Sequence, residues 1–365
     1  MNSRIISQLA AHLQTVPDDV QITPIRHGTL ERNNVWRLTV SGKRYILKQH
    51  LIAHPIGESA FTPFQVESAI LSALHQESCR VPQIVWKSEA DLCLLLEWCG
   101  ENTLDDQAQE TPTTDLKEIA RNVVREFCRL ENGFVNQIQA IKPYIYPLDY
   151  PAFLRDTMQA LLARGRKTMG YLGWLRGQPM PPDQQTAIDA IWEHLSDCLH
   201  RAGTTLGSLD YNARNVVVDG DKPTFIDFAS VGWDWQERRL VQSLNSLGAN
   251  RLGGNFACLL DGEIVSEYAS QVATSGGDDS QAEIAARVDY HNVLFYLSIA
   301  YRILQVTAQP ERLENRLLLK AWGDAKVRLR RAIDLLVDSR LSDDPYANQI
   351  REFIAECRSS SLKRF

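Results

Sequence analysis

Residues 206–228, which read LGSLDYNARNVVVDGDKPTFIDF, hold the side chains best suited to chemistry. Asn215 follows Asp210 by five positions, and Asp227 lies twelve positions further on. Phosphoryl transfer from ATP needs a carboxylate that accepts or orients the proton of the acceptor hydroxyl. It also needs oxygen ligands that hold Mg²⁺ against the triphosphate. The segment supplies these residue types, with Asp210 as the catalytic carboxylate and Asn215 and Asp227 as metal ligands.

A β-hairpin is expected to bring these side chains together. Residues 215–218 and 223–228 read as strands, and an Asp-Gly-Asp turn joins them. Two adjacent antiparallel strands place Asn215 and Asp227 at the same end of the hairpin, while Asp210 lies in the loop before it. The local pattern therefore predicts one site.

The rest of the chain reads as a β-rich segment followed by a mainly helical one. The first hundred residues have the pattern β-β-α-β-β after a short amphipathic helix at 4–13, with strands at 35–40, 45–48, 83–87 and 92–96 and a helix at 63–74. Apolar residues at three- and four-residue intervals then predict helices at 116–130, 151–164, 186–201, 289–304, 311–336 and 347–357. Loops are expected at 102–114, 165–183 and 273–280.

In these motifs the chain resembles the aminoglycoside phosphotransferase/choline kinase group of the protein-kinase-like superfamily. The catalytic loop of that group reads H-x-D-x-x-x-x-N, with a metal-binding Asp about a dozen residues further on. The corresponding residues here are Ser208, Asp210, Asn215 and Asp227. The resemblance covers about residues 20–240. It implies a bilobal α+β fold, with a nucleotide-binding lobe at 1–100 and a helical catalytic and substrate lobe at 101–365.

The resemblance also assigns residues to the nucleotide. Lys48, at the end of a strand, stands where the family keeps the lysine that contacts the α- and β-phosphates. Glu67, on the next helix, stands where the family keeps the glutamate that pairs with that lysine. Gly28 occupies the turn that covers the phosphates, and Glu97 and Cys99 lie in the inter-lobe hinge, whose backbone meets the adenine. ATP and Mg²⁺ are therefore the implied cofactors.

Three residues depart from the pattern of kinases. Ser208 replaces the loop histidine, whose usual role is to orient the catalytic loop and the metal-binding segment. Ala229 stands where protein kinases have the glycine of D-F-G, and Gly28 is the only glycine of its turn. The first departure motivates an alternative function, a pseudokinase that binds nucleotide or a partner without turnover. The other two argue against a protein kinase, the second alternative.

The substrate cannot be read from the sequence, although four residues are candidates to contact it. Trp233 and Trp235 could stack on a sugar, a heterocycle or a quaternary ammonium, or they could anchor the following helix in the core. Asp234 could face the acceptor or cap that helix, and Arg214 could touch phosphate or substrate. Residues 87–131 contain 11 acidic and 5 basic side chains and mildly favour a cationic acceptor, but such runs are more often solvated faces.

Each site residue also has a structural interpretation. Asp210 could be a turn residue and Asn215 a cap at the entry of a strand. Lys48 could be a solvated lysine of an edge strand, Glu67 a solvated helix glutamate, and Gly28 a turn glycine without further role. The combination of these residues at the spacing of the family favours the functional interpretation.

The composition excludes several classes of protein. The 365 residues are 44% hydrophobic and 23% charged with a net charge of −6, which is typical of a globular protein and not of a general nucleic-acid-binding surface. The 7 cysteines are scattered without a C-x-x-C pair, which argues against a zinc knuckle or a redox motif. No apolar stretch is long enough to span a membrane, and no signal peptide is recognisable. We therefore expect a cytoplasmic enzyme with a small-molecule hydroxyl substrate; its oligomeric state is open.

Overall fold

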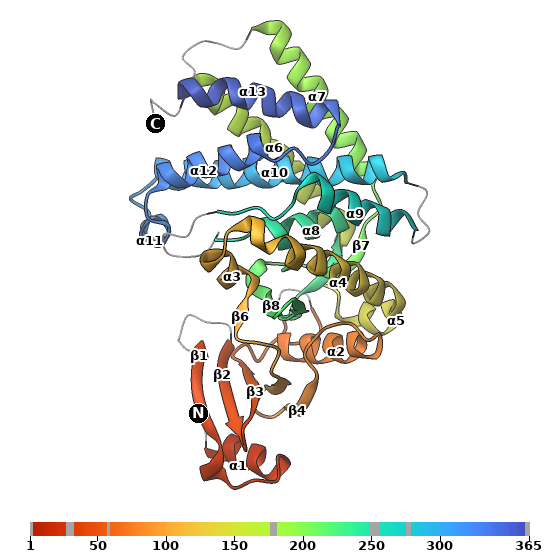
Figure 1. The fold of residues 1–365 in the computed structure, drawn as a ribbon, viewed down its shortest axis with the longest axis vertical. Coiled ribbons are helices and arrows are strands. Elements are labelled where there is room, and N and C mark those ends of the chain that lie inside the picture. Colours follow the sequence, from red (N-terminus) through yellow and green to blue (C-terminus); the bar gives the residue numbers. More distant parts are fainter. Residues whose placement is uncertain are drawn as a thin grey trace.

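The computed structural model describes residues 3–26, 33–56, 59–175, 181–248, 256–274 and 279–361. Gly28 lies outside these residues, so its role in covering the phosphates stays a prediction. In Figure 1 the N-terminal strands form one end of the elongated molecule and the C-terminal helices form the other.

A five-stranded antiparallel sheet forms the N-terminal part of the molecule. The order is β1-β2-β3-β5-β4, with strands β1 (Gln21–Arg26), β2 (Asn33–Val40), β3 (Lys43–His50), β4 (Ile84–Ser88) and β5 (Cys93–Glu97). The expected strand pattern lacked β1, whose Pro24 and polar residues weaken the alternation typical of a strand. Because β3 lies between β2 and β5, Lys48 is on a central strand and its expected alternative as an edge-strand lysine does not hold.

The two faces of this sheet are covered by different helices. Successive side chains of a strand point to opposite faces. Accordingly, Cys93 and Leu95 pack in a cluster with α1 (Ser3–His12), whereas Leu94 and Leu96 pack in a cluster with α2 (Pro63–Gln76). A capping box at Thr62 and Gln65 fixes the start of α2. This helix therefore has a defined position against the sheet.

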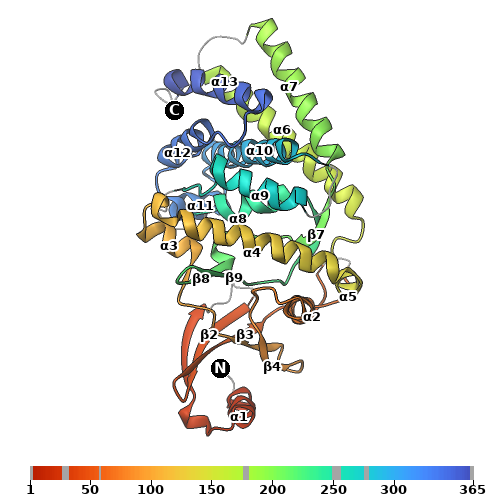
Figure 2. The same ribbon diagram turned by 45° about the vertical axis from the view of Figure 1, so that its right-hand side comes forward.

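The C-terminal part is mainly helical. Its helices are α3 (Leu104–Glu110), α4 (Lys117–Asn136), α5 (Ile138–Ile141), α6 (Tyr150–Leu175), α7 (Pro182–Arg201), α8 (Gln236–Asn245), α9 (Gly262–Thr274), α10 (Gln281–Ala308), α11 (Leu313–Trp322), α12 (Ala325–Asp338) and α13 (Pro345–Ser361). Figure 2 shows α4 between the N-terminal sheet and the remaining helices. The division into an antiparallel sheet and a mainly helical part is the expected α+β architecture.

Three expectations about this part were wrong in detail. The loop expected at 165–183 is largely helical, because α6 runs on to Leu175 and α7 begins at Pro182. The single helix expected at 311–336 is two helices, α11 and α12, separated at Gly323, whose φ of +74° suits a helix end. Helices α8 and α9 and the short α3 were not expected.

Two small sheets hold the segment that carries the chemistry. One pairs β7 (Thr205–Ser208) with β10 (Val231–Asp234), and the other has the order β6-β8-β9, formed by Asn102–Thr103, Val216–Asp219 and Lys222–Phe225. The expected hairpin is thus β8 and β9, with β9 ending two residues before Asp227. The four-residue β7 and β10 were not expected.

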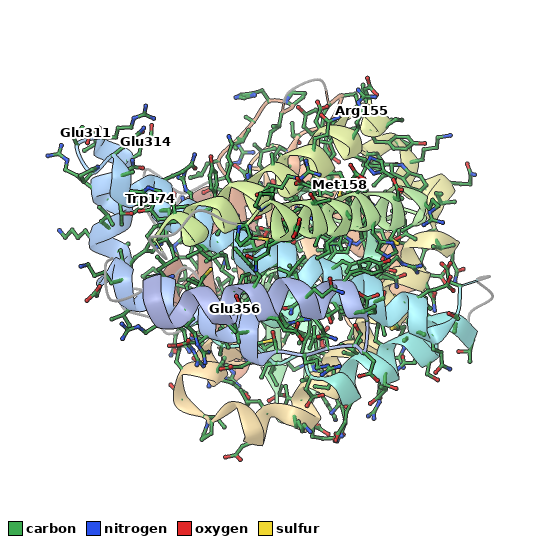
Figure 3. The ribbon with its side chains drawn as sticks, turned by 90° about the horizontal axis from the view of Figure 1, so that it is seen from above. Arg155, Met158, Trp174, Glu311, Glu314 and Glu356 are labelled. Carbon is green, nitrogen blue, oxygen red and sulfur yellow. The ribbon has the colours of Figure 1, made fainter. Side chains whose placement is uncertain are left out.

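The buried apolar side chains of the described residues form three clusters. The largest joins α2 and β5 to α4, β8, β9, α8 and α9, so the sheet-bearing and helical parts share apolar packing. A second cluster joins α6, α7, α10, α12 and α13, which gather at the far end of the molecule. Figure 3 views this end from above, with Arg155 and Trp174 marking the two ends of α6. The predicted lobe boundary near residue 100 falls between β5 and β6.

None of the helices in the described part of the chain is long and apolar enough to cross a membrane.

Candidate active site

Lys48, Glu67 and Asp227 form the polar centre of the site, and each comes from a different element. The Nζ of Lys48, on β3, lies 2.7 Å from Oε2 of Glu67 on α2 and 2.7 Å from Oδ1 of Asp227. The side chain of Glu67 is 1% exposed, and that of Asp227 is 26% exposed. One ammonium group thus bridges a buried carboxylate and a carboxylate that solvent can reach.

Electrostatics keep this centre charged. Burial alone would lower the pKa of Lys48, but the charges of Asp227 and Glu67 raise it above its ordinary value. Burial alone would raise the pKa of Glu67, but Lys48 and a contact with His50 lower it to about 2. The Nε2 of His50 lies 2.8 Å from Oε2 of Glu67. Glu67 is therefore a carboxylate at any ordinary pH, held from two sides.

Asp227 has an unusual backbone conformation. Its φ is +69°, in the left-handed region that residues other than glycine rarely adopt. The amide N–H of the preceding Ile226 donates to the carbonyl of Asn215 at 2.9 Å, and the next residue, Phe228, is 1% exposed in the core. Packing on both sides therefore maintains a conformation that costs about 1–3 kcal/mol, as is common at functional sites.

The catalytic loop between β7 and β8 is held by hydrogen bonds within itself. The Nδ2 of Asn212 donates to Oδ1 of Asp210. The Nδ2 of Asn215 donates to the backbone carbonyl of Asp210 at 3.0 Å, which leaves the amide oxygen of Asn215 available as a ligand. The amide of Asp210 donates to Oγ of Ser208 at 3.2 Å. Ser208, in the position of the expected histidine, thus contacts the loop that it precedes.

A buried ionic network supports this loop from behind. Arg239, on α8, is 0% exposed and pairs with Glu131 of α4 through its Nη2 and, at 3.1 Å, through its Nε. The hydroxyl of Tyr211, next to Asp210, donates to Oε1 of Glu131 at 3.0 Å. Gly207 lies against the guanidinium, since a Cβ there would be 2.7 Å from Cζ of Arg239. The network thus contacts Gly207 and Tyr211, which precede and follow Asp210 in the chain.

The predicted hinge is a well-packed connection between β5 and β6. The side chain of Glu97 is exposed, and its backbone N–H donates to the carbonyl of Gln83 at 2.9 Å. The Sγ of Cys99 donates to the carbonyl of Glu97 at 3.6 Å, and burial raises the pKa of this thiol to about 12. Gly100 has φ +144°, and a Cβ there would be 2.9 Å from Cγ1 of Val217. The contact of Glu97 and Cys99 with adenine stays a prediction.

The structure separates the four candidate substrate residues. Trp235 is 4% exposed, and its indole N–H donates to the carbonyl of Leu199 at 3.0 Å, so it is a core residue. Asp234 is 1% exposed and accepts from the amide of Trp235 and from Arg238, so it is a structural carboxylate at the start of α8. The half-buried Trp233 stacks on Tyr150 with ring centres 5.1 Å apart.

Arg214 is the candidate that reaches open space. It is exposed and lines a cavity of about 660 Å³, a volume within the range of small-molecule sites. Asp210 and Asp227 line the same cavity. The substrate contact of Arg214 stays a prediction. The other three candidates, Trp233, Asp234 and Trp235, are not among the residues that line this cavity.

The donor set fits Mg²⁺ in its chemistry. Mg²⁺ is usually bound through one or two carboxylates, with other oxygen ligands and waters completing the shell. Asp227 offers a carboxylate that lines the cavity. Asn215 offers its amide oxygen, because its hydrogen bond to Asp210 uses the amide nitrogen. Among the described residues there is no cluster of three or more His, Cys, Asp or Glu side chains that would hold a metal alone. The pair suits a metal that arrives with phosphate ligands.

Sequence reasoning missed two contributors, His50 and the pair of Glu131 and Arg239. His50 follows Lys48 by two residues on β3, so both side chains lie on the same face, and this spacing could have indicated a second partner for Glu67. The pair joins α4 to α8 across 108 positions. No local signal in the sequence indicates that contact.

Comparison with protein families adds independent information. The model of the phosphotransferase enzyme family matches residues 21–258, about two thirds of the chain. No curated protein is similar enough in sequence to match. The match spans the sheet, the hinge, the catalytic loop and the segment after Asp227.

Comparison with solved structures finds three kinases that this chain resembles. A choline/ethanolamine kinase family protein from Mesorhizobium loti has a TM-score of 0.50 and 12% identity, covering 97% of this chain and 98% of that one. An ethanolamine kinase from Plasmodium vivax has a TM-score of 0.49 and 12% identity, with coverage of 87% and 82%. A spectinomycin phosphotransferase solved with ADP and spectinomycin has a TM-score of 0.49 and 12% identity, with coverage of 98% of both chains. The likeness to the Mesorhizobium loti protein supports the predicted α+β fold, which the sheet and helices of this chain also show.

Proposed function

Because the chain belongs to the phosphotransferase enzyme family, we propose that it transfers the γ-phosphoryl group of ATP, with Mg²⁺, to a hydroxyl group of a small molecule. One observation carries the proposal. The ammonium group of Lys48 bridges the carboxylates of Glu67 and Asp227, and Asp227 and Asp210 both line one cavity. The arrangement supports the proposal because phosphoryl transfer needs a cation for the phosphates, a carboxylate for the metal and a carboxylate for the acceptor hydroxyl near one another.

The chain's own residues have separate roles in this proposal. Lys48 would hold the α- and β-phosphates, and Glu67 would fix the position of its ammonium group. Asp227 and Asn215 would hold the metal ion. When bound, Mg²⁺ supplies positive charge that offsets the charge of the phosphates. Asp210, fixed by the amide of Asn212, would orient the acceptor hydroxyl and take its proton.

Substituting Asp210 tests the proposal. We expect Asp210→Ala to lower the rate of Mg²⁺-dependent phosphate transfer about 10²–10⁴-fold, because general-base groups contribute on that order. The KM for ATP should stay within a few-fold, since Asp210 contacts the acceptor and not the nucleotide. The measurement is ADP formation with a panel of hydroxyl metabolites. Asp219→Ala, at the exposed turn of the same hairpin, is the matched control and should keep full activity.

The same assay separates the alternatives. ATP binding without ADP formation for any metabolite would support a pseudokinase, and label appearing only on a polypeptide would support a protein kinase. An Asp210→Ala protein that retains activity within a few-fold of the wild type would contradict the role given to Asp210.

A further inference from the structure

The cavity of about 660 Å³ beside Asp210 has a wall that is aromatic and aliphatic. Phe61 and Tyr144 pack together with ring centres 4.5 Å apart, and Tyr146 and Ile56 line the same space. Phe61 and Tyr144 pack against the largest apolar cluster on one side, but they and Tyr146 are only partly buried and Ile56 is 38% exposed, so part of their surface lines the cavity. An aromatic or aliphatic body would gain free energy by covering them.

The charges of the cavity differ from those of a site for a cationic ligand. Of the described residues that line it, Asp210 and Asp227 are the acidic ones, and both already have roles in the proposed transfer. Arg214 contributes a positive charge to the lining of the cavity, and its guanidinium makes no ion pair with a described carboxylate. An exposed arginine without a carboxylate partner suits a carboxylate or another anionic group on the ligand.

The acidic stretch that mildly favoured a cationic acceptor does not line this cavity. Three of its carboxylates have partners elsewhere: Glu101 pairs with two arginines of the sheet, the carboxylate of Asp105 accepts from the amide of Gly248 at 2.6 Å, and Glu131 belongs to the network behind the loop. None of the described residues of this stretch is among those that line the cavity, so the stretch gives no support to a cationic acceptor there.

Asn33 adds a buried polar group to the lining of the cavity. This residue is 8% exposed and lines the cavity from the start of β2. Its Oδ1 is buried and has no hydrogen-bond partner among the described residues. A buried acceptor left unpaired is unfavourable, so a donor on the ligand, such as a second hydroxyl, would be favourable there.

From these features we infer that the phosphate acceptor is a hydroxyl compound with an aromatic or aliphatic body and an anionic group that pairs with Arg214, and not a cationic amino alcohol or aminoglycoside. The inference rests on the proposed function and names the substrate class of the same site. In the reaction the acceptor oxygen forms a bond to the γ-phosphorus. The bond from that phosphorus to the bridging oxygen breaks, ADP leaves with the electron pair, and the hydroxyl proton passes to Asp210.

Three benzyl alcohols whose para substituent is anionic, neutral or cationic test the inference. They are para-(hydroxymethyl)benzoate, para-xylylene glycol and para-(aminomethyl)benzyl alcohol, each measured for transfer of phosphate from ATP with Mg²⁺. We expect kcat/KM to fall in the order anion, neutral, cation, with at least a tenfold difference between the first and the last. Choline and kanamycin serve as further cationic probes and should be poorer than the anion.

Reversing the charge of Arg214 provides the matched variant. Arg214→Glu should lower kcat/KM for the anionic probe at least tenfold and raise it for the cationic one, so that their order reverses. Arg340→Glu, at an exposed arginine between α12 and α13, carries the same change of net charge and should leave the order unchanged.

Every other outcome overturns the inference. A preference for the cationic probes, an order that Arg214→Glu does not alter, or transfer to none of the three probes would contradict it. Mg²⁺-dependent binding of ATP, measured calorimetrically on the same samples, separates this failure from failure of the proposed function, because it does not depend on the acceptor.

Discussion

Glu67 is the residue on which the charge of the polar centre depends. Its carboxylate receives Lys48 on one side and His50 on the other, and it is almost completely buried. In the unfolded chain the same carboxyl group has its ordinary pKa of 4.5, whereas in the folded protein the pKa is about 2. The folded protein thus binds fewer protons than the unfolded chain between these values, and stability rises with pH across this window.

Glu67→Gln should remove this dependence. At pH 7 we expect the variant to lose on the order of 3 kcal/mol of unfolding free energy relative to the wild type, and this difference should shrink as pH falls from about 4.5 towards 2. Urea unfolding at several pH values measures it. Glu89→Gln, at an exposed glutamate, should show no such trend. A difference between wild type and Glu67→Gln that is the same at pH 7 and pH 3 would contradict this interpretation.

The sequence allowed the residues of the site to be located better than their environments. Asp210, Asn215 and Asp227 lie within one local segment, and turn chemistry and strand spacing indicate their arrangement. The indole of Trp235 donates to the distant Leu199, and Asp234 lies opposite Thr205 in the pairing of β10 with β7, so these two could not be distinguished from cavity residues by sequence position.

At the scale of elements, α4 and α8 hold the catalytic loop through the pair of Glu131 and Arg239. A second buried ion pair, Asp289 and Arg351, joins α10 to α13 beside the second apolar cluster, with 3.1 Å between Oδ2 of Asp289 and Nη1 of Arg351. The two pairs are similar in burial, since all four side chains are at most 5% exposed. They differ in that only the first contacts Tyr211, the neighbour of Asp210.

Glu131→Gln and Asp289→Asn should therefore separate a positioning role from a structural one. Each removes one charge of a buried pair and should cost about 3–5 kcal/mol of unfolding free energy. Only Glu131→Gln should lower kcat, by about tenfold or more with little change in the KM for ATP, because the loop that carries Asp210 loses its support. Initial rates per folded enzyme, with the folded fraction taken from circular dichroism, are the measurement. Equal effects on kcat would contradict a positioning role for Glu131.

Elements that depend on long-range contacts were the ones that the sequence did not reveal. Strands β7 and β10 have four residues each, and they pair although more than 20 residues separate them in the sequence, so neither has a local strand signal. Helix α6 continues through Gly165, where a Cβ would lie 2.5 Å from Cη2 of Trp192, so a glycine typical of a loop is a packing requirement here. Tertiary packing overrides local propensity in both cases.

At the scale of the whole molecule, the site lies where the sheet and the helical part meet. The largest apolar cluster includes α2 from one part and α4, β8 and β9 from the other. The polar centre follows the same division, because Lys48 and Glu67 come from the sheet side and Asp227 from the helical side. The central claim is that this junction binds ATP together with Mg²⁺, with Asp227 as a metal ligand.

Calorimetric titration of ATP into the protein, with Mg²⁺ and with EDTA, tests this claim most directly. For the wild type we predict that Mg²⁺ raises the affinity for ATP at least tenfold. For Asp227→Asn, which keeps the size of the side chain and removes its charge, we predict that Mg²⁺ changes the affinity by less than about twofold. An affinity for ATP that responds equally to Mg²⁺ in both proteins, or no binding of ATP to the wild type, would contradict the claim.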